Sequence, residues 1–274
     1  MIESDGCIVV PKSFRSPKGN IYYPSIQIAF NIKDYPLAVI IKQVIGHGSI
    51  QNFEARGACV LYINNAQGVQ IVINFINGKM RTPKVEALHR LITYLNKTNS
   101  KQLIPLLGID ETCLFSNAWL AGFVDGDGYF CVAIPSSSLE RGKGVLSPRF
   151  IVEQKENRTS SGESNGGFML KIAQTFEGYL THRDRGGIKG SSYTVTIAKL
   201  SSLSLVILYF SLFPLFSSKR LNYLDWKAVT EMVQNREHLT PEGFLKIKAK
   251  KGSMNNHRTE FNWDFLTQDH FYQQ

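Results

Sequence analysis

Residues 120–128 read Leu-Ala-Gly-Phe-Val-Asp-Gly-Asp-Gly, and this stretch decides the fold. The apolar residues that lead into the acidic end predict a helix over 117–125, with Ser116 or Asn117 as the N-cap. Gly128 is expected to end this helix in a left-handed turn. The sequence therefore predicts a short apolar helix that delivers acidic side chains at its C-terminal end.

The glycines and the last aspartate of this stretch indicate packing and chemistry. Gly122 and Gly126 are four residues apart, so they lie on one helix face and allow a partner backbone to approach closely. The helix macrodipole disfavours an anion at the position of Asp127 by about 0.3–1 kcal/mol, which indicates a bound cation or a catalytic task. Two alternatives stay open: Gly126 belongs only to the turn, or Asp127 lies in an Asp-Gly turn without chemistry.

A calcium loop of the EF-hand type is excluded by spacing. Counted from Asp125, the sixth residue is Phe130 and the twelfth is Ser136. The EF-hand requires glycine and glutamate at these two places.

An internal repeat organises the chain. Glu3-Ser4-Asp5-Gly6 matches Asp125-Gly126-Asp127-Gly128, and each acidic segment is followed by β-prone and apolar helical stretches. Each copy later carries a lysine before an amphipathic helix, Lys84 in the first and Lys219 in the second. If two such helix ends pack together, their aspartates repel each other unless a divalent metal lies between them, and Mg²⁺ suits carboxylates, waters and phosphate oxygens. This arrangement fits metal-assisted attack of water on a phosphodiester.

The periodicity predicts an α+β fold with antiparallel sheets. Expected strands are 25–31, 59–63 and 193–197, and expected helices are 36–45 (capped by Asp34), 69–76, 168–179 and 200–210. The expected domains are an N-terminal repeat over 1–95, a linker over 96–116, a C-terminal repeat over 117–238 and a basic tail over 239–274.

Composition narrows the class of protein. The chain of 274 residues has a formal net charge of +9, which favours a polyanionic partner, and nucleic acid is the common case. The four cysteines form no C-x-x-C pair and are expected to be buried reduced thiols, with no zinc site. The longest apolar run, 203–216, is too short to span a bilayer, so no membrane partner is expected.

With these residues in place, the chain resembles the LAGLIDADG family of homing endonucleases and maturases, in the two-motif, organelle intron-encoded form. Residues 116–130 resemble the second motif over its full length, and residues 1–7 resemble the latter half of the first. Looser similarity covers 77–84, 213–219 and 239–247, so the resemblance extends over nearly the whole chain.

The resemblance implies a fold and a mechanism. Each repeat is expected to be an αββαββα unit, with the motif helices at a pseudo-twofold interface and the sheets forming a β saddle over DNA. Ser4 takes the small interface position that Gly126 takes in the second copy. The last acidic residue of each motif, Asp5 and Asp127, is implied to bind Mg²⁺, with Lys84 and Lys219 assisting beside the scissile phosphate.

Met1 falls in the middle of the first motif. The first motif helix is therefore expected to be barely one turn long, and the activity of this chain is in question. The two interpretations are a reading frame that begins upstream and a decayed copy.

DNA-contacting residues are expected on the strands and loops, where alternate side chains reach bases and Lys or Arg reaches phosphates. The candidates are Lys12, Arg15, Lys18, Ser25, Gln27, Asn31 and Arg56 in the first repeat, and Arg149, Lys155, Arg158, Arg183, Arg185, Lys189, Thr194 and Thr196 in the second. A basic run in the tail, Lys246, Lys248, Lys250 and Lys251, either touches phosphate or is solvated.

Three functions are compatible with this sequence. The first is a monomeric enzyme that cleaves double-stranded DNA at an intron-insertion site. The second is a maturase that folds the host intron RNA without cleaving, and the third is a DNA-binding regulator with an inactive site. The aspartates favour cleavage. The resemblance places the protein in the mitochondrion, with the plastid as the alternative.

Overall fold

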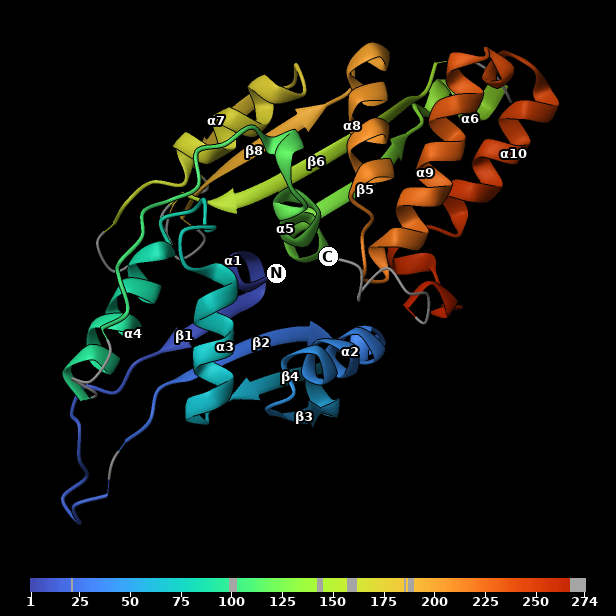
Figure 1. Ribbon diagram of the computed structural model, residues 1–274. Helices are drawn as coiled ribbons and strands as arrows, with labels where there is room; N and C mark the ends of the chain where they lie inside the picture. Colours follow the sequence, from blue (N-terminus) through green and yellow to red (C-terminus); the bar gives the residue numbers. More distant parts are fainter. Residues whose placement is uncertain are drawn as a thin grey trace. The chain divides into compact units, whose positions relative to one another are not determined.

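The computed structural model describes residues 1–20, 22–98, 103–141, 145–156, 162–184, 186 and 190–266. The chain divides into two compact units, with the main boundary between Cys113 and Leu114. Each unit contains a four-stranded antiparallel sheet with helices packed on it (Figure 1).

The first unit follows the order αββαββα with one further helix. Its elements are α1 (Ile2–Asp5), β1 (Gly6–Val9), β2 (Ser25–Asn31), α2 (Tyr35–Ile45), β3 (Ser49–Phe53), β4 (Ala58–Ile63), α3 (Ala66–Ile76) and α4 (Val85–Thr98). The strands lie in the order β1-β2-β4-β3. All three pairings are antiparallel, and a short turn joins β3 to β4.

The second unit repeats this order, with α6 inserted between its first two strands and α10 added at its end. Its elements are α5 (Trp119–Asp127), β5 (Gly128–Ala133), α6 (Ser136–Arg141), β6 (Ser147–Lys155), α7 (Gly166–Thr175), β7 (Tyr179–Asp184), β8 (Ser191–Ile197), α8 (Leu200–Leu212), α9 (Lys219–Gln234) and α10 (Pro241–Gly252). The strand order β5-β6-β8-β7 matches that of the first unit. The expected α+β class and the two αββαββα repeats are therefore confirmed.

Alternation along the strands explains why each sheet has one covered face. Ile26 and Ile28 on β2 are at most 3% exposed, and Phe150 and Val152 on β6 are fully buried. Side chains of a strand point alternately to its two faces, so the intervening residues lie on the opposite face. The apolar face of each sheet packs against helices, which leaves the other face for polar side chains.

Two local expectations need correction. The helix expected over 168–179 ends at Thr175, because Tyr179 begins β7 and pairs with Thr196. Sheet pairing therefore overrides the local helical pattern. Asp34 lies at the N-cap of α2 without a side-chain capping hydrogen bond.

The cysteines are free thiols, as expected, but only Cys59 is buried. Cys7 is exposed because it lies at an outward position of β1, and Cys113 is exposed in the segment that follows the first unit's helices. The expectation that all four are buried was therefore wrong.

Residues 103–113 run as an extended strap that is fastened to the first unit. Asn96 exchanges two side-chain hydrogen bonds with Ile104, at 2.9 Å each. Asn77 donates to the Pro105 carbonyl oxygen at 2.9 Å, and a ring nitrogen of His89 lies 2.7 Å from the Leu107 oxygen. Part of the expected linker is thus held by specific side chains.

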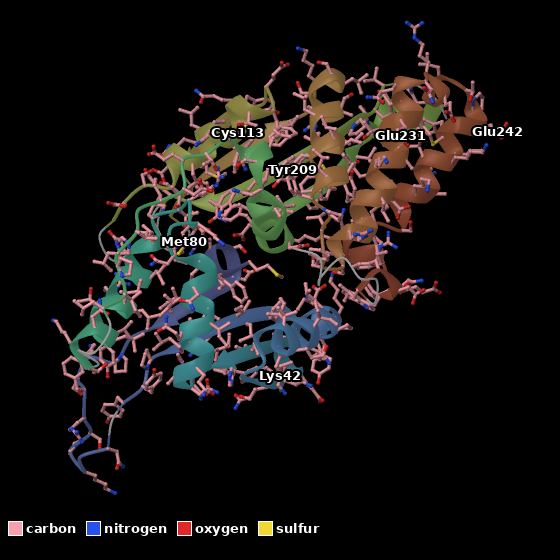
Figure 2. The ribbon with its side chains drawn as sticks, in the orientation of Figure 1. Lys42, Met80, Cys113, Tyr209, Glu231 and Glu242 are labelled. Carbon is pink, nitrogen blue, oxygen red and sulfur yellow. The ribbon has the colours of Figure 1, made fainter. Side chains whose placement is uncertain are left out.

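The expected basic tail begins with folded structure. Helix α10 buries Phe244 and Ile247, while Lys246 pairs with Glu242 at 2.8 Å and Lys250 pairs with Asp225 at 3.3 Å. Glu242, in the first turn of α10, is labelled in Figure 2. Among the described residues, the helices are all too short or too polar to cross a bilayer.

Candidate active site

Both motif helices pass directly into a strand. Helix α1 ends at Asp5 and β1 starts at Gly6, while α5 ends at Asp127 and β5 starts at Gly128. Gly128 has φ −85° and ψ 158°, which is extended backbone. The expected left-handed turn at Gly128 is therefore wrong, because the chain continues straight into the sheet.

Glycine is needed here for space. A Cβ atom on Gly128 would lie 2.3 Å from Cγ1 of Val124 and 2.9 Å from the Val124 carbonyl oxygen. A Cβ atom on Gly6 would lie 2.5 Å from the Ile2 carbonyl oxygen. In both repeats the first strand residue is packed against the helix turn that precedes it, so any side chain would displace the acidic helix end.

The two aspartates have different surroundings. Asp5 is exposed and Asp127 is half-buried. Gln154 on β6, itself only 2% exposed, donates a hydrogen bond from Nε2 to Asp127 Oδ2. The residue that takes the place of Gln154 on β2 is Phe30, as judged by the shared register with Gly128 and Gly6, and its side chain has no polar atom.

Sequence reasoning missed Gln154, although the sequence carried a signal. Phe150, Val152 and Gln154 occupy one phase of the alternating strand, and all three are buried. An amide at an inward position among apolar residues needs a hydrogen-bond partner. That requirement could have directed attention to this residue.

The two predicted lysines bind the carbonyl ends of the motif helices. Lys84 Nζ donates to the carbonyl oxygens of Ile2, Ser4 and Gly6 at 3.0, 3.2 and 2.9 Å. Lys219 Nζ donates to the Val124 oxygen at 3.1 Å and to the Gly126 oxygen. The last carbonyls of a helix have no partner within the helix, and a cation there also offsets the macrodipole.

A second carboxylate in each motif points into the protein. Asp125 is 6% exposed and Glu3 is 9% exposed. Asp125 accepts hydrogen bonds from the backbone N–H groups of Phe216 and Ser217 at 3.0 and 2.9 Å, and from Ser217 Oγ at 2.6 Å. Burial raises the pKa of the Asp125 carboxyl, and the hydrogen bonds from Ser217 and Phe216 act in the opposite direction.

Glu3 makes the matching contacts in the first repeat. Its Oε1 accepts from the backbone N–H groups of Arg81 and Thr82 at 2.8 and 2.7 Å. These two residues precede Lys84 as Phe216 and Ser217 precede Lys219. In each repeat, therefore, a carboxylate of the motif helix accepts from N–H groups of the loop, and the lysine of that loop donates to carbonyl oxygens of the helix end.

The small residues predicted at the repeat interface lie on the motif helices. Ser4 is buried and donates from Oγ to the Met1 carbonyl oxygen at 2.9 Å, while Gly122 and Gly126 are half-buried on α5. Their role in packing between the repeats stays a prediction.

Most of the described candidates for DNA contact lie on strands and loops, while Arg56 lies in a short 3-10 helix and Thr196 is buried, which argues against a DNA contact for Thr196. Lys12, Arg15, Asn31, Arg56, Lys155 and Arg183 are exposed, and Gln27 and Arg149 are half-buried. Gln27 and Asn31 lie on the face of β2 opposite to Ile26 and Ile28, and Arg149 and Lys155 lie on the corresponding face of β6. Arg158, Arg185 and Lys189 lie outside the described residues.

The donor set suits a hard divalent cation that is only partly bound by protein. Within the described part of the chain, His, Cys, Asp and Glu nowhere gather in groups of three or more that could enclose a metal. Mg²⁺ is usually bound through one or two carboxylates, with waters and substrate phosphates as the remaining ligands. A single accessible aspartate at each helix end fits this pattern.

The family is established by comparison with known proteins. The family model described as LAGLIDADG endonuclease matches residues 1–95 and 120–230. The chain therefore belongs to the LAGLIDADG endonuclease family.

Two curated relatives are similar over most of the chain. The intron-encoded DNA endonuclease aI3 of Saccharomyces cerevisiae is 29% identical, with 97% of this chain and 70% of the relative covered. The uncharacterized cox1 intron-2 37.2 kDa protein of Schizosaccharomyces pombe is also 29% identical, with 81% of this chain and 64% of the relative covered.

Solved structures share the fold. The crystal structure of the I-SmaMI LAGLIDADG homing endonuclease bound to cleaved DNA has a TM-score of 0.71 at 22% identity, and covers 94% of this chain and 95% of that one. A structure of I-SmaMI bound to uncleaved DNA in the presence of calcium ions has a TM-score of 0.69 at 21% identity, and covers 93% of this chain and 96% of that one.

Proposed function

We propose that the chain is a site-specific endonuclease that cleaves double-stranded DNA at an intron-insertion site, with Mg²⁺ as cofactor. One observation carries the proposal: in each repeat the motif helix ends in an aspartate, Asp5 or Asp127, with a lysine ammonium bound to the backbone beside it. The names of I-SmaMI and of aI3 as DNA endonucleases support this activity over splicing assistance alone.

The chain's own residues have separate tasks in this mechanism. Asp5 and Asp127 would hold the metal, and Gln154 orients the Asp127 carboxylate through its hydrogen bond. A bound divalent ion lowers the pKa of a metal-bound water and offsets negative charge on the phosphodiester. Lys84 and Lys219 add fixed positive charge beside the scissile phosphate, since their ammonium groups are already held by helix carbonyls.

The outer faces of the two sheets contact the DNA. Lys12, Arg15, Arg56 and Arg183 are exposed and suit phosphates, while Gln27 and Asn31 are amides that suit base edges. The net charge of +9 supports a polyanionic partner. Because both repeats stand on one chain, the enzyme acts as a monomer. The cox1 intron named for the Schizosaccharomyces pombe relative supports a mitochondrial location.

The test is strand-resolved nicking of a duplex that carries the intronless insertion site, with Mg²⁺ present. We expect cleavage by the unchanged chain and a loss of about 100-fold or more for Asp127→Asn, as is typical when a metal-holding carboxylate is removed. A chain that cuts nothing, or an Asp127→Asn variant that cuts equally well, would contradict the proposal. Asp184→Asn, an exposed aspartate on β7, is the matched control and should cut normally.

A further inference from the structure

The end of each motif helix carries two carboxylates with opposite surroundings. Asp127 is half-buried, whereas Asp125 is 6% exposed. Residues two apart on a helix point to nearly opposite sides, so these two groups cannot serve the same ligand. Asp125 therefore needs an explanation separate from metal binding.

The contacts of Asp125 fasten the helix end to a loop distant in sequence. Both carboxylate oxygens are used: Oδ2 accepts from Phe216 N, and Oδ1 accepts from Ser217 N and Ser217 Oγ. The Ser217 hydroxyl oxygen in turn accepts from Lys219 N at 3.2 Å. The carboxylate thus organises the loop that leads into α9.

The same loop returns hydrogen bonds to the helix. Lys219 Nζ donates to the carbonyl oxygens of Val124 and Gly126, which lie on either side of Asp125 in the chain. Each partner therefore stabilises the other, because the carboxylate satisfies loop N–H groups while the lysine satisfies helix C=O groups. We call the network of Asp125, 216–217 and Lys219 the second clamp.

The first repeat builds an equivalent network from different residues. Glu3 accepts from Arg81 N and Thr82 N, Thr82 Oγ1 accepts from Lys84 N at 3.3 Å, and Lys84 Nζ donates to Ser4 O and Gly6 O on either side of Asp5. We call this network the first clamp. The two clamps share their connectivity although a glutamate replaces an aspartate and a threonine replaces a serine.

The first clamp holds the end of α1 through many contacts. It supplies at least five hydrogen bonds to the helix and to the strand residue that follows it. The position of Asp5 is therefore held by tertiary contacts. In α5 the clamp acts on the last turn, where helices fray.

We propose that Asp125 and Glu3 are positioning residues, which hold the motif-helix end so that the aspartate two residues later is preorganised for the divalent cation. This inference rests on the proposed function. Neither residue touches the cation: each acts through the backbone of the helix end, with the lysine of its clamp as the counterpart. Loss of partners that orient a metal ligand typically lowers metal affinity or activity by about 10–100-fold.

The experiment uses the full chain with Asp125→Asn, an isosteric change that turns one acceptor into a donor facing an N–H group. Strand-resolved nicking is measured across a Mg²⁺ titration, and hydrogen exchange of 124–130 is measured in the metal-free protein. We expect the Mg²⁺ concentration for half-maximal nicking to rise by about tenfold, partial rescue by excess Mg²⁺, and faster exchange at the helix end.

The matched control loosens the other end of the same helix. Tyr209 on α8, labelled in Figure 2, donates from its hydroxyl to the Asn117 oxygen at 2.9 Å and accepts from Ala121 N at 3.3 Å. Tyr209→Phe should speed exchange near 117–122 and leave the Mg²⁺ midpoint unchanged. If Asp125→Asn behaves like this control, with altered stability and an unchanged Mg²⁺ midpoint, the inference is wrong.

Two further outcomes keep the tests distinct. If Asp125→Asn does not fold, Ser217→Ala decides, since it keeps the carboxylate and both backbone donors and removes the 2.6 Å hydroxyl contact together with the acceptor of Lys219 N. It should raise the Mg²⁺ midpoint about twofold. If Asp127→Asn cuts as well as the unchanged chain, the proposed function fails. Suppose instead that Asp127→Asn nicks more slowly, but Ser217→Ala and Asp125→Asn leave the Mg²⁺ midpoint unchanged. Then only the positioning role is overturned, and the proposed function stands.

Discussion

The first and second clamps hold matching aspartates, Asp5 and Asp127, but distribute their hydrogen bonds differently. Oε1 of Glu3 accepts from two backbone N–H groups, whereas two N–H groups and a hydroxyl are divided between the two oxygens of Asp125. Lys84 places all three of its N–H donors on carbonyls of the helix end. Both repeats therefore link a helix carboxylate and a loop lysine in the same way. The lysine contributes most of the hydrogen bonds in the first repeat, and the carboxylate contributes most of them in the second.

The surroundings of the clamps differ more strongly. In the first repeat the loop residue Arg81 is buried and binds Asp110 Oδ2 at 2.7 Å and Thr112 Oγ1 at 2.8 Å. Arg81 follows Met80, which is labelled in Figure 2. Its counterpart in the second repeat is Phe216, which has no polar side-chain atom. The first clamp is therefore tied to the strap over 103–113 through an ion pair.

The largest effect is expected from breaking this ion pair. The two side chains are 3% and 10% exposed, so Asp110→Ala leaves a buried guanidinium without its carboxylate and should lower the free energy of unfolding by about 3–5 kcal/mol. Urea unfolding of the full chain measures this loss. Asp110→Asn retains an acceptor and should lose less. A loss below about 1 kcal/mol for Asp110→Ala would show that the other contacts of Arg81, those to Thr112 among them, are sufficient.

The next effect separates the two carboxylates. Asp125→Asn must set an N–H₂ group against an N–H donor, because both carboxylate oxygens are in use, and should cost about 2–3 kcal/mol of unfolding free energy. Glu3→Gln can keep its carbonyl oxygen on both backbone donors and should cost about 1 kcal/mol or less. Paired denaturation curves check this ranking. Equal losses would contradict the contrast drawn between the clamps.

The third effect concerns the glycines that follow the aspartates. Gly6→Ala and Gly128→Ala should each cost about 2 kcal/mol through overpacking. At Gly128 the nearest atom is the Val124 side chain, so the cost should fall by about half in a Val124→Ala background. At Gly6 the nearest atoms are backbone atoms of Ile2, so an Ile2→Ala background should bring no relief. Double-mutant cycles measure both costs. Equal relief of the glycine substitutions in the Val124→Ala and Ile2→Ala backgrounds would contradict this prediction.

The smallest effect tests the amide beside Asp127. Gln154→Leu removes the donor to Asp127 Oδ2 and should slow nicking about tenfold, which corresponds to about 1.4 kcal/mol in the activation free energy. Phe30→Leu, at the matching position of the first repeat, should change stability slightly and leave the rate unchanged. A rate loss in Phe30→Leu of the same size would mean that the effect comes from packing.

Much of this molecule could be predicted from its sequence. The repeat, the α+β class and the strands β2, β4 and β8 follow from alternation and from the acidic-glycine segments, because a period of two is a strong local signal. The end of α7 and the conformation of Gly128 could not be predicted. Both depend on partners distant in sequence, namely Thr196 for Tyr179 and the strand pairing of Gly128 with Val152.

The candidate site could be predicted only in part, because local patterns reveal single residues but not their contacts with distant parts of the chain. Spacing singled out Asp5, Asp127, Lys84 and Lys219, since each stands in a recognisable local pattern. It did not indicate that the lysines bind helix carbonyls, or that Glu3 and Asp125 bind loop N–H groups 78 to 92 residues away along the chain. Such contacts depend on the folded loop, which no periodicity encodes. Gln154 could have been predicted, because it is a polar residue at an inward position of a strand whose other inward residues are apolar.

The saturated ammonium of Lys84 has a consequence for chemical labelling. Acylating reagents attack the nitrogen of the amine, and the three hydrogen bonds that tie Lys84 Nζ to carbonyl oxygens must break before this nitrogen can react. Lys12 and Lys18 are exposed and serve as internal references in the same protein. The modification rate of Lys84 relative to these two lysines therefore reports how often the helix end opens. Mass spectrometry can measure this rate on the protein without any substitution.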